Sequence, residues 1–288
     1  MKTLKSFVCG KWVEGTGERS KLVNPTTEEV LAETSTGGVD FAAALDFART
    51  VGNPALRAMT FAERGAMIAA VASTMHAHRE ELVDLALANG GNTRGDAKFD
   101  IDGATGTLSY YASLGQTLGD ARVMADGEMT QLGRSPRLVG QHVRLPLTGA
   151  AVQINAFNFP AWGFGEKAAC AWLAGMPVVV KPATSTALVA ARIAEILVEA
   201  AVVPDGAFTF LAGGAGDLLD HLTSQDAVAF TGSSDTGAMI RGHANVVRHS
   251  IRVNVEADSL NAAVLGVDVE HGSDTYEMFL REVAKDIT

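Results

Sequence analysis

The stretch GAAVQINAFNFPAWGFGEKAACAWLAGMPVVVKP, residues 149–182, decides the fold. Its two ends, GAAVQINA and MPVVVKP, are short β-rich runs, and the segment GEKAACAWLAG between them has the composition of a helix. A strand, a helix and a second strand in this order predict parallel neighbours joined by a right-handed crossover.

The same alternation continues to residue 257. It predicts a Rossmann-like, doubly wound α/β fold, with a parallel sheet and helices on both faces. The later helices are expected at residues 186–202, 217–224 and 235–246, the later strands at 207–213, 227–232 and 251–257, and a turn at 204–206.

The part before residue 149 is interpreted as mainly helical after a short strand at residues 7–13. A helix over residues 60–91 opens with a capping box, Thr60 and Glu63, and closes on Gly90 and Gly91. Residues 120–146 alternate in short runs broken by glycine and proline, which predicts a hairpin excursion.

The composition of the 288 residues excludes several classes of protein. A net charge of -10 without a basic stripe argues against nucleic acid as a partner. Two cysteines are too few for a disulfide framework, and the longest apolar segment carries Arg192 and Glu195, which argues against a membrane span. His76 and His78 lack metal-ligand spacing, so no metal site is expected. From the few cysteines and the lack of a membrane span we infer a cytoplasmic protein.

Polar residues that follow the predicted strands are the candidates for function, because ligands of such sheets bind outside the carboxyl ends of the strands. These residues are Asn158, Lys181, Gly213, Thr231, Gly232, Ser233 and Glu256.

Each candidate also has a purely structural interpretation. The motif FTGSSDTG, residues 230–237, fits a phosphate-binding helix N-terminus and a plain N-cap about equally well. The glycine-rich loop LAGGAGD is by itself weak evidence for dinucleotide binding. An isolated Lys181 is more often solvated, and a strand-end Glu256 is more often salt-bridged than a base of raised pKa. Asn158 either donates to an oxyanion from a dry pocket or braces its own turn.

Four motifs together resemble the aldehyde dehydrogenase superfamily. They are FNFP (157–160), VKPAT (180–184), FTGSSDTG (230–237) and VEADS (255–259), in the family's order and with similar spacing. Further segments, including ALRAMTFAER, YASLG and EADSLN, resemble the members from phenylacetate and benzoyl-CoA degradation, so the resemblance implies a CoA-linked semialdehyde substrate.

The resemblance also implies the role of each motif residue. Asn158 would be the oxyanion donor and Glu256 the base that activates water. The cofactor would be bound by Ala156, Phe157, Lys181, Thr184, Gly213, Thr231, Gly232, Ser233, Thr236 and Ala257. A homodimer or higher homo-oligomer of the full-length form is implied as well.

Two departures from the family change these expectations. Thr184 replaces a glutamate that holds the ribose 2′-hydroxyl in many NAD-preferring members, so NADP is expected, with NAD possible. The family's cysteine nucleophile is matched neither by Cys9 nor by Cys170, which is expected to be a buried structural thiol.

The resemblance places the nucleophile shortly beyond Thr288. We therefore expect residues 1–261 to be an NAD(P)-binding domain, and residues 262–288 to begin a truncated catalytic domain. The alternative is a natural, inactive module that binds cofactor or pairs with full-length subunits. A reductase with direct hydride transfer ranks third, because it leaves Asn158 and Glu256 unexplained.

Overall fold

The computed structural model describes residues 2–258 and 262–287, and it divides the chain into two compact units, Met1–Ala257 and Asp258–Thr288. The predicted domain boundary at residue 261, and the end of the VEADS motif, lie outside the described residues.

A seven-stranded sheet forms the centre of the first unit, in the order β12-β11-β8-β9-β10-β2-β3. The five strands that the sequence predicted within residues 149–257 are mutually parallel, which confirms the doubly wound class. They are β8 (Ala151–Ile154), β9 (Val178–Lys181), β10 (Phe208–Phe210), β11 (Ala227–Gly232) and β12 (Arg252–Ala257). The order runs outward from β8 in both directions, so the topological switch point lies between β8 and β11.

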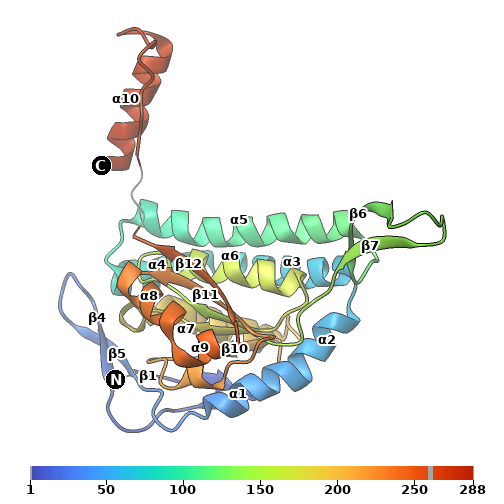
Figure 1. Ribbon diagram of the computed structural model, residues 1–288. Coiled ribbons are helices and arrows are strands. Elements are labelled where there is room, and N and C mark those ends of the chain that lie inside the picture. Colours follow the sequence, from blue (N-terminus) through green and yellow to red (C-terminus); the bar gives the residue numbers. More distant parts are fainter. Residues whose placement is uncertain (1, 259–261, 288) are drawn as a thin grey trace. The chain divides into compact units, whose positions relative to one another are not determined.

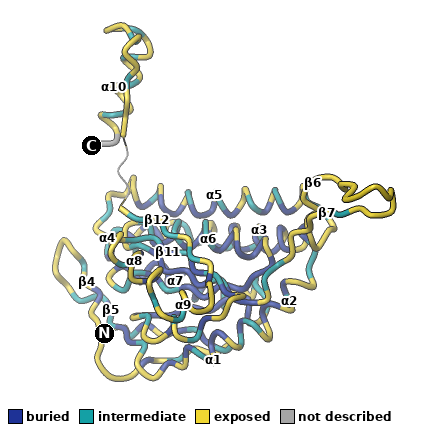
Figure 2. The backbone as a smooth tube through the Cα atoms, in the orientation of Figure 1, coloured by how far each residue is buried: buried dark blue, intermediate teal, exposed yellow. Residues whose placement is uncertain are grey.

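Helices cover both faces of the sheet, as expected for this class (Figure 1). One core cluster joins one face of the sheet to α3 (Phe61–Ala77), α5 (Arg94–Leu118), α6 (Pro160–Leu173) and α7 (Ala187–Ala200). The other joins the opposite face to α1 (Phe41–Phe47), α8 (Ser234–Gly242) and α9 (Ala244–Arg248). Figure 2 shows the buried sheet between these layers.

The N-terminal part is not simply helical after one strand, as the sequence suggested. Strands β2 (Ser6–Val8) and β3 (Lys11–Val13) form a hairpin that extends the main sheet antiparallel to β10. A second sheet contains β1 (Lys2–Leu4), β4 (Ser20–Val23) and β5 (Val30–Thr34). The turn between β4 and β5 is fixed by Asn24, whose Oδ1 accepts the Thr26 and Thr27 N–H groups.

The predicted helix over residues 60–91 is two helices, α3 and α4 (Arg79–Gly90). The Thr60–Glu63 capping box is present, and Gly91 ends α4 in the left-handed conformation. His78 interrupts the pattern with φ -104° and ψ 16°. Two short elements, η1 (Ala48–Gly52) and α2 (Asn53–Ala58), precede α3.

Two other predicted helices are shorter than expected. Residues 217–224 contain only a 3-10 turn, η3 (Leu218–His221), because the buried Asp226 carboxylate accepts Thr223 N–H at 2.6 Å and ends the helix there. Residues 235–246 are divided between α8 and α9 at His243, whose φ and ψ of -60° and 132° are not helical.

Residues 124–144 form the predicted hairpin, from β6 (Met124–Gln131) and β7 (Val139–Arg144). It extends from the end of α5, and almost all of its residues are exposed (Figure 2). A further 3-10 turn, η2 (Thr184–Thr186), precedes α7.

The second unit contains α10 (Asp274–Ile287), whose Tyr276 ring lies against the ring of His271, with centroids 4.5 Å apart. Within residues 2–258 and 262–287, no helix is long and apolar enough to cross a membrane, and no cluster of side chains suits a metal ion.

Candidate functional site

The carboxyl ends of β8, β9, β11 and β12 lie along one edge of the sheet, because these strands are parallel and adjacent. Ile154 pairs with Lys181 across β8 and β9, and Thr231 pairs with Glu256 across β11 and β12. The predicted residues therefore gather at one edge, on both sides of the switch point.

Asn158 follows a segment whose backbone is held at two points. Asn155 N–H donates to the Lys181 carbonyl at 3.0 Å, and the Thr186 hydroxyl donates to the Phe157 carbonyl at 2.9 Å. The Asn158 side chain is exposed and makes no hydrogen bond to any described residue. Neither the predicted dry pocket nor the turn-bracing role is present in this chain by itself, and the amide is free to bind a ligand.

Lys181 ends β9 with its ammonium half-buried. Burial lowers the pKa of Lys181, because the charged form loses water. Among the described residues, no carboxylate or carbonyl pairs with this ammonium. A partly desolvated cation without a protein partner is suited to an anionic or hydroxyl-rich ligand.

Glu256 is held in place by the neighbouring strand. The Thr231 hydroxyl donates to Glu256 Oε2 at 3.1 Å, across the β11–β12 pair. The Glu256 side chain is exposed, and no described residue forms a salt bridge with it. A water molecule can reach this carboxylate from the solvent side.

The segment after β11 has the geometry that the motif predicted. Ser233 is the N-cap of α8, and its Oγ accepts Thr236 N–H at 3.3 Å and donates to Thr236 Oγ1 at 3.0 Å. The capping interpretation is therefore present in the structure. It leaves Gly232 at the end of β11, where a Cβ atom would lie 2.6 Å from the Phe230 ring.

The remaining predicted cofactor residues lie at the ends of strands or in the segments that follow them. Thr184 begins η2, and Ala257 pairs with Gly232 at the end of β12. Ala156 precedes Phe157, whose side chain is 65% exposed. Gly213 is buried with φ +136°, and a Cβ atom there would lie 3.2 Å from Thr36, so its backbone is covered by the segment after β5.

The prediction for Cys170 is wrong, because this thiol is exposed. Helix α6 is apolar on nearly every side, so its sequence does not show which side faces solvent. The helix rises about 1.5 Å per residue, which places Cys170 roughly 15 Å along the axis from Pro160. Cys9 lies in the β2–β3 turn, where burial raises its pKa and its Sγ donates to the Ala43 carbonyl.

Sequence reasoning missed two charged residues beside the site. Asp100 of α5 is 1% exposed, and its carboxylate accepts N–H groups from the first turn of α6. Lys167 of α6 has a side chain only 10% exposed, and it pairs with Glu166 at 2.7 Å. An isolated aspartate within a helical pattern gives no local signal, since its partners lie about 60 positions away.

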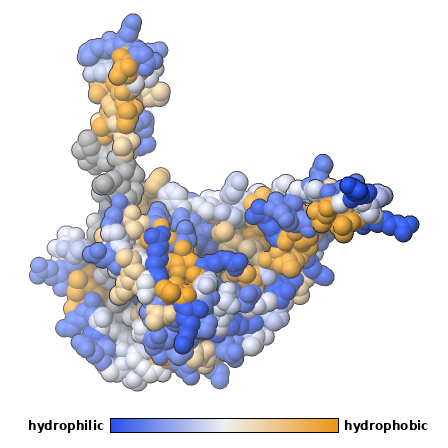
Figure 3. Space-filling view, in the orientation of Figure 1, coloured by the Kyte–Doolittle hydropathy of each residue, from blue (hydrophilic) through white to orange (hydrophobic). Residues whose placement is uncertain are grey.

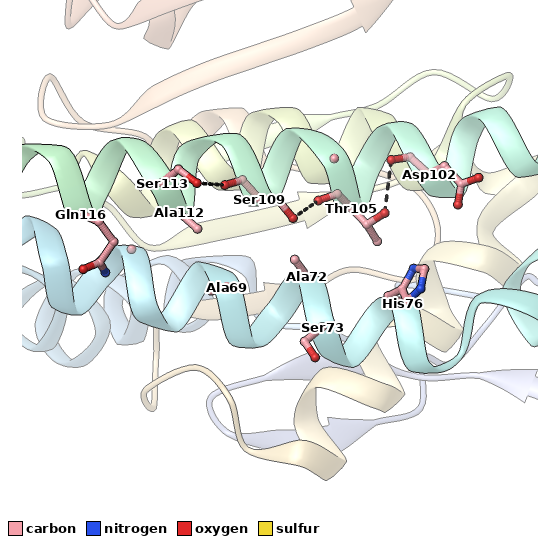
Figure 4. Close-up of a pocket in the computed structure, with 12 residues that line it drawn as sticks. Ala69, Ala72, Ser73, His76, Asp102, Thr105, Ser109, Ala112, Ser113 and Gln116 are labelled. Atoms are coloured by element: carbon pink, nitrogen blue, oxygen red, sulfur yellow. Dashed lines mark hydrogen bonds between the residues drawn. The ribbon is translucent and has the colours of Figure 1, made fainter.

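A groove of about 690 Å³ lies elsewhere, between α3 and α5 (Figure 4). Small and polar side chains line it, among them Ala69, Ser73 and Ser109. The Ser109 and Ser113 hydroxyls donate to carbonyls of their own helix. None of the predicted site residues lines this groove, so it is not the site that the strand ends form.

The model of the aldehyde dehydrogenase family matches residues 12–275, which is most of the chain. The chain belongs to the aldehyde dehydrogenase family. It is 49% identical over 285 residues to 3,4-dehydroadipyl-CoA semialdehyde dehydrogenase of Aromatoleum evansii, and the match covers 99% of this chain and 55% of that relative. This confirms the resemblance stated for the motifs.

Solved aldehyde dehydrogenases have the same fold. An NAD-dependent benzaldehyde dehydrogenase from Corynebacterium glutamicum superimposes with a TM-score of 0.76 at 28% identity, over 88% of this chain and 54% of the other. A 3,6-anhydro-L-galactose dehydrogenase in complex with NAP gives 0.77 at 22% identity, over 89% and 52%. The chain thus spans about half the length of the relatives it matches.

Proposed function

We propose that this chain provides the cofactor-binding part of an NADP-linked aldehyde dehydrogenase, together with two groups of its reacting centre. The observation that carries the proposal is Lys181, a half-buried cation without a partner among the described residues, at the carboxyl edge where such sheets bind nucleotides. The N-terminus of α8, beside the switch point, supplies the complementary anion site.

The residues at this edge fit a phosphorylated dinucleotide. Lys181 would bind a ribose hydroxyl or phosphate oxygen, and the backbone at Gly232 and Ser233 would approach the pyrophosphate. Thr184 introduces no negative charge beside the ribose, so a 2′-phosphate meets no repulsion there, which supports NADP over NAD. The bound cofactor would accept the hydride of the aldehyde.

Asn158 and Glu256 would serve the aldehyde carbon. The free amide of Asn158 would donate a hydrogen bond to the oxyanion that forms when a thiolate attacks the aldehyde. Glu256, held by Thr231, would accept a proton from the water that hydrolyses the resulting thioester. The rigid turn around Asn158 fixes the donor before the reaction, which reduces reorganisation.

The nucleophile is the remaining requirement, and neither thiol meets it. Cys9 lies in the β2–β3 turn with a raised pKa, and Cys170 lies near the far end of α6. We therefore expect the 288 residues alone to bind cofactor without oxidising aldehyde. In the whole protein, a cysteine from the part of the family fold not represented here would supply the thiolate.

The proposed substrate is a CoA-linked semialdehyde of aromatic-compound degradation, oxidised to its acid in the cytoplasm. This rests on the 49% identity to a relative with that substrate in its name. We also propose that the full-length protein is a homo-oligomer. The exposed β6–β7 hairpin supports this, because its Met129, Leu132 and Leu138 are 54–68% exposed. Figure 3 shows apolar side chains on the surface of this hairpin.

The positions of the two thiols also favour a second candidate, a non-catalytic module that binds cofactor or pairs with complete subunits. Both candidates predict cofactor binding, so only a measurement of aldehyde oxidation distinguishes them. Oxidation of a CoA-linked semialdehyde by the 288-residue chain would exclude the inactive module and our interpretation of both cysteines. Replacement of Cys170 by Ala would then show whether that thiol is the nucleophile.

The proposal is tested by titrating NADP and NAD into the chain and following heat or protein fluorescence. We expect saturable binding of both, tighter for NADP, and little binding of either in a Lys181→Ala variant. Tight NAD binding without NADP binding would contradict the cofactor assignment. Absence of any dinucleotide binding by the folded chain would contradict the proposed function as a whole.

A further inference from the structure

The first turn of α6 has no local cap, although it directly follows the Asn158 turn. Its N-cap residue is Phe159, which has no side-chain acceptor, and Pro160 occupies the first helical position. The N–H groups of Ala161 and Trp162 therefore require acceptors from elsewhere in the fold, because the first N–H groups of a helix have no partner within it.

Asp100 of α5 provides both acceptors. Its Oδ1 accepts Trp162 N–H at 2.7 Å, and its Oδ2 accepts Ala161 N–H at 3.1 Å. The negative charge also lies at the positive end of the α6 dipole, which favours it. One buried side chain thus links the long helix α5 to the residues that follow Asn158.

The electrostatic setting of Asp100 is simple. Burial raises its pKa to about 6, and the two N–H groups oppose that rise. Burial and these two N–H groups are the causes of the shift. The charged groups on the surrounding helices are not among them: Lys98 and Asp102 on α5, His76 on α3, Arg79 on α4, and Glu166 and Lys167 on α6. Protonation of this one carboxyl near pH 6 would therefore remove one of the two acceptors.

Neighbouring residues of α5 make further contacts with the same turn. The Thr107 hydroxyl accepts the Trp162 indole N–H at 3.1 Å, and the Phe99 and Trp162 ring centroids are 5.1 Å apart. A Cβ atom on Gly103 would lie 2.4 Å from the Trp162 ring, so α5 approaches closely at this point. The Asp100 contact is the charged part of a continuous surface.

We propose that Asp100 is a positioning residue, which holds the first turn of α6 and thereby fixes the Asn158 turn for cofactor and aldehyde. The Thr186 hydroxyl donates to the Phe157 carbonyl, so the two contacts lie on either side of Asn158 along the chain. The inference rests on the proposed function for its consequence in binding. Its structural part, the control of the α6 turn, stands independently.

Amide hydrogen exchange tests the structural part with an Asp100→Asn variant. Asparagine keeps one acceptor and turns a donor toward the second N–H, so we expect protection of Ala161 and Trp162 to fall about tenfold or more. The matched control is Asp102→Asn, which removes the same charge from α5 but breaks a pair with Arg79 of α4. Equal protection in the wild type and the Asp100 variant would overturn the proposal.

If the Asp100→Asn variant does not fold, hydrogen exchange of the wild-type protein at two pH values provides the test. Exchange measured at pH 7 and pH 5, corrected for intrinsic rates, should show protection at Ala161 and Trp162 lower at pH 5. The two N–H groups favour the charged carboxylate, so protonation makes a local opening of this turn easier as long as Asp100 itself stays buried. Unchanged protection across that range would overturn the proposal as well, because Asp100 would then not control the turn through its charge.

Cofactor affinity tests the consequence. The NADP dissociation constant of Asp100→Asn should be about tenfold above wild type at pH 7, and the ratio should approach one at pH 5, where wild-type Asp100 is protonated. A ratio of the two dissociation constants that does not change with pH would indicate a merely structural role and would overturn the proposal. Taking the ratio cancels titration of the cofactor's own 2′-phosphate. If the wild type binds no NADP, the proposed function fails, and the exchange experiments still decide the inference.

Discussion

Replacement of Lys181 by Met should improve the stability of the chain and weaken cofactor binding. Methionine keeps a long, flexible stem and removes the ammonium. The wild-type ammonium is half-buried without a partner among the described residues, so its desolvation opposes folding. The free energy of unfolding at pH 7 should therefore be higher in Lys181→Met than in the wild type.

The same ammonium should be a strong hydrogen-bond donor to the cofactor. A hydrogen bond from a charged group contributes about 1.5–3 kcal/mol, so the NADP dissociation constant should rise roughly 10- to 150-fold in the variant. Urea unfolding and calorimetric titration measure the two quantities on the same sample. Lys11→Met on β3 is the matched control, because it removes an exposed charge from the edge strand at the other end of the main sheet from β11 and β12.

The pH dependence has a defined sign. Burial lowers the Lys181 pKa in the folded chain below its ordinary 10.5. At pH values between the lowered pKa and 10.5, Lys181 is therefore protonated in the unfolded chain and deprotonated in the folded one. The contribution of Lys181 to the free energy of unfolding thus rises with pH in that window, and Lys181→Met should lack this rise. A variant that is less stable at pH 7 and binds NADP as tightly as wild type would refute the reasoning.

Three further changes have expected outcomes. Folding raises the Asp100 pKa from 3.8 to about 6, so its contribution to the free energy of unfolding should fall by about 3 kcal/mol as pH rises through that window. Urea unfolding of wild type and Asp100→Asn between pH 4 and 7 measures the difference, and parallel curves would contradict it. Asp226→Ala should lower the free energy of unfolding by about 3–5 kcal/mol, because it leaves Arg49 without its carboxylate partner and the Ala150 N–H without an acceptor; a loss below about 1 kcal/mol in urea would contradict this. Thr184→Glu should weaken NADP about tenfold in competition titrations and leave NAD the tighter ligand, and unchanged selectivity would contradict the role of Thr184.

Much of the α/β part was predictable because its signals are local. Strands such as residues 227–232 are short apolar runs that end in glycine, and the chain order fixes their parallel arrangement. The Thr60–Glu63 capping box was also visible in the sequence, because both partners lie within four residues. The gathering of Lys181 and Thr231 at one edge follows from the same topology.

What the sequence did not predict depends on distant contacts. Asp226 ends the predicted helix at residues 217–224 while also accepting Ala150 N–H, and no local pattern encodes that pairing. The short strand β4 alternates over too few residues to be recognised. Cys170 was misplaced because the apolar side chains of α6 face two directions, toward the sheet and toward α5.

The central claim is that NADP binds at the carboxyl edge of the sheet, and chemical-shift mapping of backbone amides during an NADP titration tests it most directly. The account predicts shifts at residues 156–158, 181–184 and 231–236, with little change in α3 and the facing side of α5. Saturable shifts confined to the groove between α3 and α5, with none at the strand ends, would contradict it.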